Sequence, residues 1–281
     1  MTWRALLAGA VERVGDHDAW RILEQASGRD GAELTLALDE DAPARAATYA
    51  EELVTRRADG EPLQYVVGRW GFRSLDLMVD RRVLIPRPET EQVVEVAMEE
   101  LARVRPAEGA PVVVDLGTGS GAIALSFAAE APGAEVWATD CSPDALAVAR
   151  ANLAGNAGRG AGHVHLVEGA WFGALPPGLR GHVNLVVANP PYVGDGEDLP
   201  PEVADWEPRG ALRSGPIGTE CLFEIVDEAP AWLTRPGALV LELAPAQAPA
   251  VVEHARAAGF TDVSVHPDLA GHDRTVAARI S

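Results

Sequence analysis

The motif Asn189-Pro190-Pro191-Tyr192 carries the most specific chemistry in this chain of 281 residues. It follows the apolar run 183–188, which predicts a buried strand. Two consecutive prolines then end the strand in a rigid, extended turn. This turn, here called the NPPY turn, presents the side-chain oxygen of Asn189, the carbonyl of Pro190 and the flat ring of Tyr192. Such a set fits an amino group on a planar carbon, as in a carboxamide or a base with an exocyclic amine.

An amide nitrogen shares its lone pair with the neighbouring carbonyl and is therefore a poor nucleophile. Two acceptors that hold its two N–H bonds fix its direction and favour loss of conjugation, which is catalysis by orientation and electrostatic complementarity. No general base is then required, but the electrophile must be strong. We therefore predict catalytic roles for Asn189, Pro190 and Tyr192, and substrate binding by the whole NPPY turn, Pro191 included.

A glycine-rich loop upstream offers a place for that electrophile. The loop lies between a β-like run at 111–114 and a helical run at 122–128. Glycines let backbone N–H groups approach a ligand closely, and a helix N-terminus favours an anionic group. A second strand at 134–139 ends about 20 residues on in an aspartate that can hold two ribose hydroxyls. The sequence thus predicts an adenosine cofactor bound by Gly117, Thr118, Gly119, Ser120, Gly121 and Asp140.

The loop alone leaves the cofactor open, because Gly117-x-Gly119-x-x-Ala122 also satisfies the dinucleotide-binding pattern. The NPPY turn favours S-adenosylmethionine, since a hydride-transfer enzyme has no use for an amide clamp and a methyl sulfonium donor needs a positioned nitrogen. We expect S-adenosylhomocysteine as the product and Asn189 beside the cofactor. His163 and His165 lack ligand partners at suitable spacing, so no metal site is predicted.

The elements that must position these groups alternate along the second part of the chain. Alternating strands and helices predict an α/β fold with a mostly parallel sheet that is covered on both faces. Helix-spaced apolar residues in 1–58 predict a small helical bundle. Residues 63–80 predict a β-hairpin with strands at 64–67 and 72–79. The strands expected in the sheet are 112–115, 135–139, 163–167, 183–188, 238–243, 261–266 and 274–280.

Composition excludes several classes of protein. The net charge is −19 and the chain has no lysine, which argues against direct nucleic-acid binding because that binding depends on clustered Lys and Arg. No apolar run resembles a signal peptide or reaches membrane-spanning length. Cys141 and Cys221 are too few for a disulfide framework. We expect a cytoplasmic protein without a membrane partner, and a monomer.

Residues 53–281 resemble the bacterial peptide chain release factor N5-glutamine methyltransferases. The resemblance rests on the glycine-rich loop and the NPPY turn together with several other segments in family order. It implies a Rossmann-like class I S-adenosylmethionine-dependent methyltransferase fold with a seven-stranded sheet. The additional segments are 61–68, 71–72, 84–91, 207–208, 211–212, Glu242 and 271–274.

The resemblance also implies an activity and a domain plan. The activity is methyl transfer to the side-chain nitrogen of the glutamine in the Gly-Gly-Gln motif of release factors, which act in translation termination. Trp171 would lie at the adenine edge, although Ala170 replaces the acidic residue that many relatives have before this tryptophan. The expected domains are a helical substrate-recognition domain at 1–60, a β-hairpin linker at 61–84 and the methyltransferase domain at 85–281.

Two alternatives remain open at the level of sequence. An amino methyltransferase acting on DNA adenine, rRNA guanine or a ribosomal-protein glutamine would share the NPPY turn. Nucleic-acid enzymes should have a more basic surface, and the string 85–90 favours the release factor type over the ribosomal-protein type. A non-catalytic adenosine-binding regulator is the other alternative, but it leaves the NPPY turn unexplained.

Overall fold

The computed structural model describes residues 1–156, 158 and 161–281. The chain forms two compact units, residues 1–70 with 200–206 and residues 71–199 with 207–281. The first unit is helical, and a short segment from late in the sequence belongs to it. Its helices are α1 (Trp3–Val14), α2 (Asp16–Ser27), α3 (Gly31–Leu36), α4 (Ala44–Ala58), α5 (Leu63–Val67) and α9 (Pro201–Ala204).

Apolar residues at helical spacing form the core of this first unit, as the sequence predicts. Ile22 and Leu23 from α2, Leu34 from α3 and Leu53 from α4 are almost fully buried. Arg57 ties three helices together, because its Nε donates to Asp18 at 2.6 Å and its Nη1 donates to Glu202 at 3.0 Å. The apolar faces of these short helices are thus buried against one another.

The strand predicted at 64–67 is wrong, because these residues form helix α5. Pro62 precedes the helix, and Gly68 ends it with a φ of +73° in the left-handed region that favours glycine. A segment of five residues, four of them apolar, is too short to distinguish a buried helical turn from a buried strand. The hairpin instead pairs β1 (Arg69–Phe72) with β2 (Leu75–Met78).

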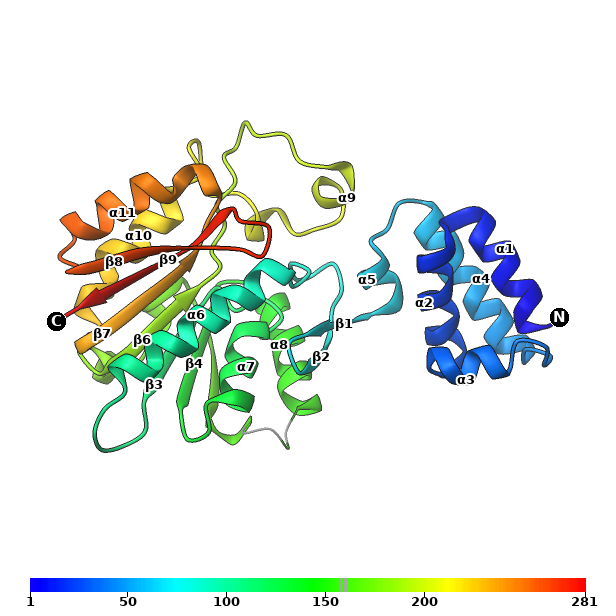
Figure 1. The fold of residues 1–281 in the computed structure, drawn as a ribbon, viewed down its shortest axis with the longest axis horizontal. Coiled ribbons are helices and arrows are strands. Elements are labelled where there is room, and N and C mark those ends of the chain that lie inside the picture. Colours follow the sequence, from blue (N-terminus) through cyan, green and yellow to red (C-terminus); the bar gives the residue numbers. More distant parts are fainter. Residues whose placement is uncertain (157, 159–160) are drawn as a thin grey trace. The chain divides into compact units, whose positions relative to one another are not determined.

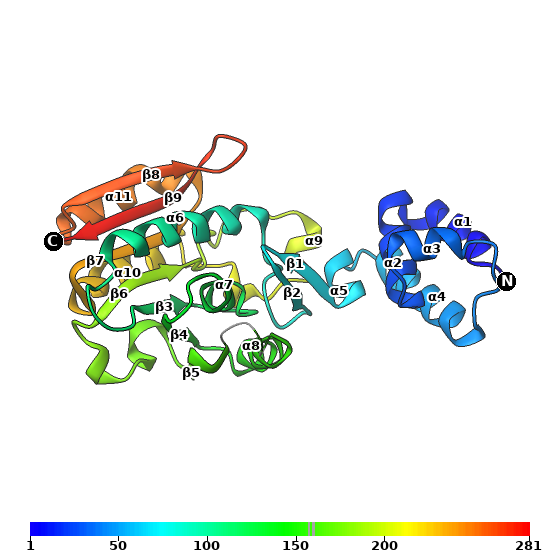
Figure 2. The same ribbon diagram turned by 60° about the horizontal axis from the view of Figure 1, so that its bottom comes forward.

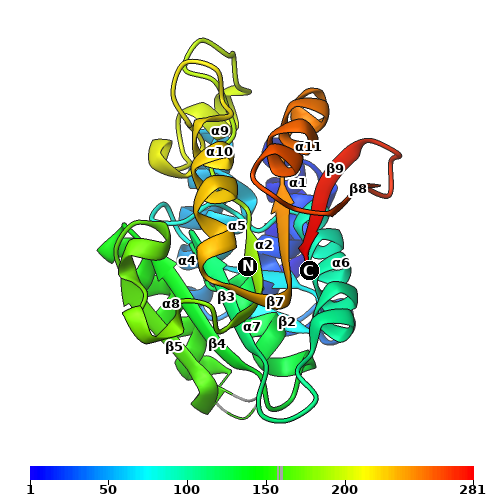
Figure 3. The same cartoon turned by 90° about the vertical axis from the view of Figure 1, so that its left-hand side faces the viewer.

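The second unit is built on a seven-stranded sheet in the order β5-β4-β3-β6-β7-β9-β8. Neighbouring strands from β5 to β7 are parallel, and β9 runs antiparallel to both β7 and β8. Figure 3 shows β5 and β8 at opposite edges of the sheet. The seven strands expected from sequence are all present, as β3 (Val112–Leu116), β4 (Glu135–Asp140), β5 (Val164–Glu168), β6 (Val183–Ala188), β7 (Leu233–Glu242), β8 (Asp262–Pro267) and β9 (Asp273–Ile280).

Helices cover both faces of this sheet (Figures 1 and 2). Alternate residues of the strands point to opposite faces, so Val113 and Val187 pack in one core while Val114 and Val186 pack in the other. The first core includes α6 (Pro88–Val104) and α7 (Ala122–Glu130), with α8 (Pro143–Gly155) beside β5, and the second includes α10 (Glu220–Glu228) and α11 (Ala248–Ala257). Short 3-10 turns occur at Ala161–His163, Trp171–Ala174, Pro177–Leu179, Arg209–Ala211, Ala229–Ala231 and Pro245–Gln247.

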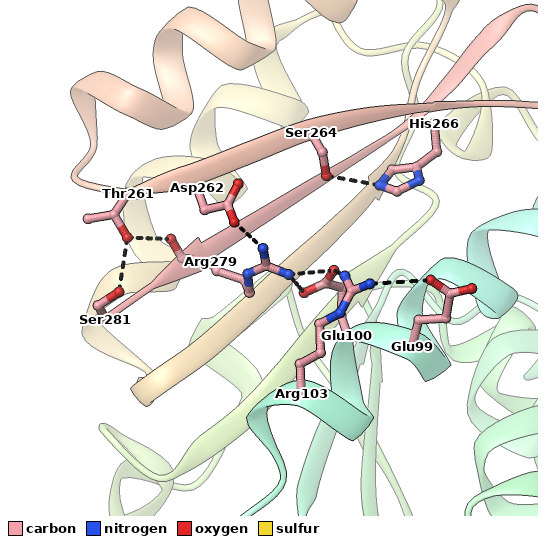
Figure 4. Close-up of polar contacts among 9 residues, drawn as sticks. All are labelled: Glu99, Glu100, Arg103, Thr261, Asp262, Ser264, His266, Arg279 and Ser281. Carbon is pink, nitrogen blue, oxygen red and sulfur yellow. Dashed lines mark hydrogen bonds and ion pairs between the residues drawn. The ribbon is translucent and has the colours of Figure 1, made fainter.

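An ion cluster around the buried Glu100 fixes α6 to the C-terminal strands (Figure 4). Glu100 of α6 is 1% exposed. Both of its carboxylate oxygens accept from Nη1 of Arg279 at 3.0 Å, and Arg103 also donates to it. Arg279 additionally pairs with Asp262 of β8. The cluster holds the C-terminal half of α6, whose first turn reaches the candidate site.

Among the residues that the structure describes, no helix is long and apolar enough to cross a membrane.

Candidate active site

The carboxyl ends of three parallel strands bring the predicted site residues together. Leu116 at the end of β3 is in register with Thr139 of β4 and with Ala188 of β6. The glycine-rich loop, Asp140 and the NPPY turn therefore meet at one edge of the sheet, where ligands bind in open α/β folds. There they surround a cavity of about 450 Å³. Of the predicted site residues, Gly117, Thr118, Gly119, Ser120, Asp140, Trp171, Asn189 and Pro191 line this cavity, and Gly121, Pro190 and Tyr192 do not.

The glycine-rich loop depends on left-handed backbone conformations. The φ angles of Gly117, Gly119 and Gly121 are +73°, +56° and +86°, which side chains of other residues rarely allow. A Cβ at Gly117 would lie 3.3 Å from the Trp171 ring, whereas a Cβ at Gly119 would meet open space. The loop therefore exposes backbone to the cavity at Gly119, while Gly121 serves as the N-cap of α7.

Asp115, near the end of β3, fixes the conformation of this loop through hydrogen bonds. Its Oδ2 accepts from Thr118 Oγ1 at 2.6 Å and from the backbone N–H of Ala124 at 3.1 Å. The residue is fully buried, and its Oδ1 has no hydrogen-bond partner in the described part of the chain. Burial raises the pKa of Asp115 to about 7. The sequence motifs did not point to a role for Asp115, although an aspartate within an apolar strand is a usable signal.

We expect Asp115→Asn to change how stability depends on pH. The ordinary pKa of an aspartate is 3.8, so at intermediate pH the native protein keeps a proton that the unfolded chain has lost. The free energy of unfolding therefore falls as pH rises toward 7, and the variant lacks this loss. In urea unfolding, the free energy of unfolding of the wild type minus that of the variant should be about 2 kcal/mol larger at pH 5.5 than at pH 8. An equal difference at both pH values, or the same change in the exposed control Asp144→Asn, would contradict this origin.

Asp140 presents its carboxylate at the cavity wall. One oxygen accepts from the N–H of Gly119 at 2.9 Å and the other from the N–H of Ser142 at 2.8 Å. Each carboxylate oxygen has a further lone pair, so both can still accept from a ligand hydroxyl. The same carboxylate therefore holds the glycine-rich loop and offers two acceptor oxygens beside the cavity.

Trp171 forms another part of the wall. It has a φ of +41°, and its ring packs over Gly117. Its Nε1 donates to Glu224 Oε2 at 3.1 Å. Ala170 also lines the cavity.

The NPPY turn separates two cavities. Asn189 and Pro191 line the larger one, and Pro190 is buried. Tyr192 lines a second cavity of about 190 Å³ with Arg87, Glu89, Glu242 and Arg274. Burial raises the pKa of the Tyr192 phenol above its usual value, so the hydroxyl remains protonated.

Two buried side chains connect the turn to α6 and β7. Asn189 Nδ2 donates to Thr90 Oγ1 at 3.1 Å, and Thr90 Oγ1 donates to Glu242 Oε2 at 2.6 Å. Tyr192 Oη donates to Glu242 Oε1 at 3.2 Å. In the sequence these residues appeared only within segments that resemble the family, and nothing local indicated that Thr90 and Glu242 contact the NPPY turn.

Comparison with known proteins identifies the family. Residues 91–204 match the family model "Methyltransferase small domain", and residues 2–68 match "PrmC N-terminal domain". A protein of Cereibacter sphaeroides named "Release factor glutamine methyltransferase" is 42% identical over 279 residues, which cover 98% of this chain and 94% of that protein. The chain belongs to the release factor glutamine methyltransferases.

Other release factor glutamine methyltransferases are similar over most of their length. The Burkholderia pseudomallei protein of that name is 42% identical, with 94% of this chain and 91% of the relative covered. A solved methyltransferase from Pyrococcus furiosus shares the fold with a TM-score of 0.53 and 19% identity, over 74% of this chain and 89% of that one. The α/β methyltransferase fold expected from sequence is thereby confirmed.

Proposed function

We propose that this chain transfers a methyl group from S-adenosylmethionine to the side-chain nitrogen of the glutamine in the Gly-Gly-Gln motif of peptide chain release factors. The observation that carries the proposal is the position of Asn189, whose side chain lies at the wall of the cavity that the glycine-rich loop also lines. The names of the relatives favour a release factor over a ribosomal protein as the substrate.

The cavity fits the proposed methyl donor. Its volume of about 450 Å³ is within the range of small-molecule sites. Asp140 offers acceptors for the two ribose hydroxyls, and the open space at Gly119 lets the backbone approach a ligand. Gly117 to Ser120 would hold the methionine part, and Trp171 would border the adenine. When bound, the donor supplies an electrophilic methyl group on a sulfonium.

The chain's own residues would then prepare the nucleophile. The side-chain oxygen of Asn189 and the carbonyl of Pro190 accept the two N–H bonds of the substrate amide and point its nitrogen toward the cofactor cavity. The nitrogen, oriented in this way, would accept the methyl group that the bound donor supplies, with the neutral thioether as the leaving group, and would release its proton to water.

Mass spectrometry of a release factor after incubation with the enzyme and S-adenosylmethionine tests this proposal. We expect a gain of one methyl group on the Gly-Gly-Gln glutamine. Total ribosomal protein, treated in parallel, should stay unmodified. A methyl group on a ribosomal protein instead would assign the chain a different substrate, and no transfer to either would contradict the proposed activity.

A further inference from the structure

Glu242 is a buried carboxyl that lies beside the NPPY turn. Its side chain is 1% exposed, and Thr90, which contacts it, is 4% exposed. Burying a carboxylate is costly unless specific partners compensate for lost water. The partners here are two hydroxyls, Thr90 from α6 and Tyr192 from the turn. This arrangement connects the carboxylate to the group proposed to hold the substrate.

The positions of the protons in this cluster follow from its donors and acceptors when Glu242 is ionised. An ionised Glu242 only accepts hydrogen bonds, so the single hydroxyl proton of Thr90 must point to it at 2.6 Å. Thr90 then offers only lone pairs to Asn189, at 3.1 Å. The amide group of Asn189 must therefore turn its Nδ2 toward Thr90, because the opposite orientation would place two acceptors against each other.

We propose that Thr90 and Glu242 are positioning residues that fix the side-chain amide of Asn189, so that its Oδ1 faces the cofactor cavity and receives an N–H of the substrate amide. This inference rests on the proposed function. The hydrogen bonds run in one direction: Asn189 donates to Thr90, and Thr90 donates to Glu242. Tyr192 donates to the other oxygen of the same carboxylate. The carboxylate of Glu242 thereby sets the direction of the hydrogen bonds made by the first and the last residue of the NPPY turn.

The state of Glu242 decides whether this orientation is enforced. A protonated Glu242 can donate to Thr90, whose own proton is then free to bond Asn189 Oδ1 in the flipped orientation. Burial raises the pKa of Glu242 to about 7, while the bonds from Thr90 and Tyr192 oppose this rise. The turnover rate should therefore be highest above pH 7 and should fall as pH decreases through that value.

Other charged groups face the same carboxyl and must be considered in a pH profile. Arg274 of β9 lowers the pKa of Glu242, and Glu89 at the start of α6 raises it. Arg87 also lines the cavity and pairs with Glu207. The pKa of Tyr192 is raised, so its phenol does not titrate near pH 7. Within this cavity Glu242 is thus the group whose pKa lies near 7.

Thr90→Val removes the hydroxyl while keeping the shape of the side chain. Asn189 Nδ2 then loses its acceptor and the amide can rotate, so we expect kcat to fall about 10–100-fold, the cost of one unsatisfied polar group. Thr90 also lines the larger cavity, but valine has nearly the same shape and keeps that part of the wall, so the KM for S-adenosylmethionine should change much less than kcat. Thr90→Ser keeps the hydroxyl and should restore most of kcat.

Glu242→Gln tests whether the carboxylate sets the direction of the hydrogen bonds between Asn189, Thr90 and residue 242. A glutamine can turn either its oxygen or its NH₂ group toward Thr90, so the orientation of Asn189 is no longer enforced. We expect kcat to fall about 10-fold or more and the decline in kcat near pH 7 to disappear. The measurement is steady-state kinetics with intact release factor between pH 5.5 and 9, with calorimetric binding of S-adenosylhomocysteine as the test of folding.

Glu99→Gln is the control, because Glu99 is a glutamate on α6 whose side chain is 59% exposed and lines neither cavity. It should keep the wild-type kcat and pH profile. Wild-type kcat in both Thr90→Val and Glu242→Gln would overturn the inference, as would a Thr90→Ser variant as impaired as Thr90→Val. If the wild-type enzyme methylates no release factor, the proposed function fails instead, which the same assay distinguishes.

Discussion

Replacing Asn189 with alanine is expected to lower the rate of methyl transfer by about 10²-fold or more, comparable to the loss of one preorganised polar contact in other enzymes. The side chain supplies one of two acceptors proposed to hold the substrate amide. Without it, the nitrogen is held only by the Pro190 carbonyl and keeps its conjugation with the amide. Single-turnover assays with saturating cofactor and release factor would measure the chemical step directly.

Cofactor binding separates this role from a general loss of structure. Asn189 lines the cavity next to the proposed donor, but Asp140 and the glycine-rich loop would hold most of that ligand. The affinity for S-adenosylhomocysteine should therefore fall much less than the rate. Asn156→Ala is the control, since the side chain of Asn156 bonds to the backbone of Asn152 at the end of α8, outside the cavity. If Asn189→Ala turned over like the wild type, the amide clamp would be wrong.

Replacing Asp140 with alanine should have its largest effect on cofactor affinity. The variant loses a carboxylate that can accept from two ribose hydroxyls, and hydrogen bonds to charged groups contribute about 1.5–3 kcal/mol each. It also releases the N–H groups of Gly119 and Ser142, which the carboxylate now holds. Two such bonds correspond to a rise in the Kd for S-adenosylhomocysteine of about 100-fold or more, measured by titration calorimetry.

The control for this variant is Asp144→Ala. Asp144 lies four residues away in the first turn of α8 and is exposed, so its replacement removes the same charge without touching the cavity. The Kd of this control should stay near the wild-type value. An unchanged Kd in Asp140→Ala would exclude the ribose role, and an equal loss in both variants would indicate a general effect of charge.

Local patterns predicted much of the fold because they depend on residues that are close in the chain. The apolar run 183–188 becomes strand β6, and the prolines after it end the strand where expected. The glycine-rich loop follows β3, and Asp140 ends β4. The exception is α5, where four apolar residues between Pro62 and Gly68 form too short a pattern to choose between helix and strand.

Sequence by itself determined the order of strands and helices, the family resemblance and the chemical nature of the NPPY turn, since proline, glycine and apolar periodicity act over a few residues. Only the tertiary structure decided which side chains support that turn. Thr90, Asn189 and Glu242 are about 50 or more residues apart and meet because α6 packs across β6 and β7. Such contacts depend on the packing of distant elements, and no local pattern encodes the direction in which Asn189 presents its amide.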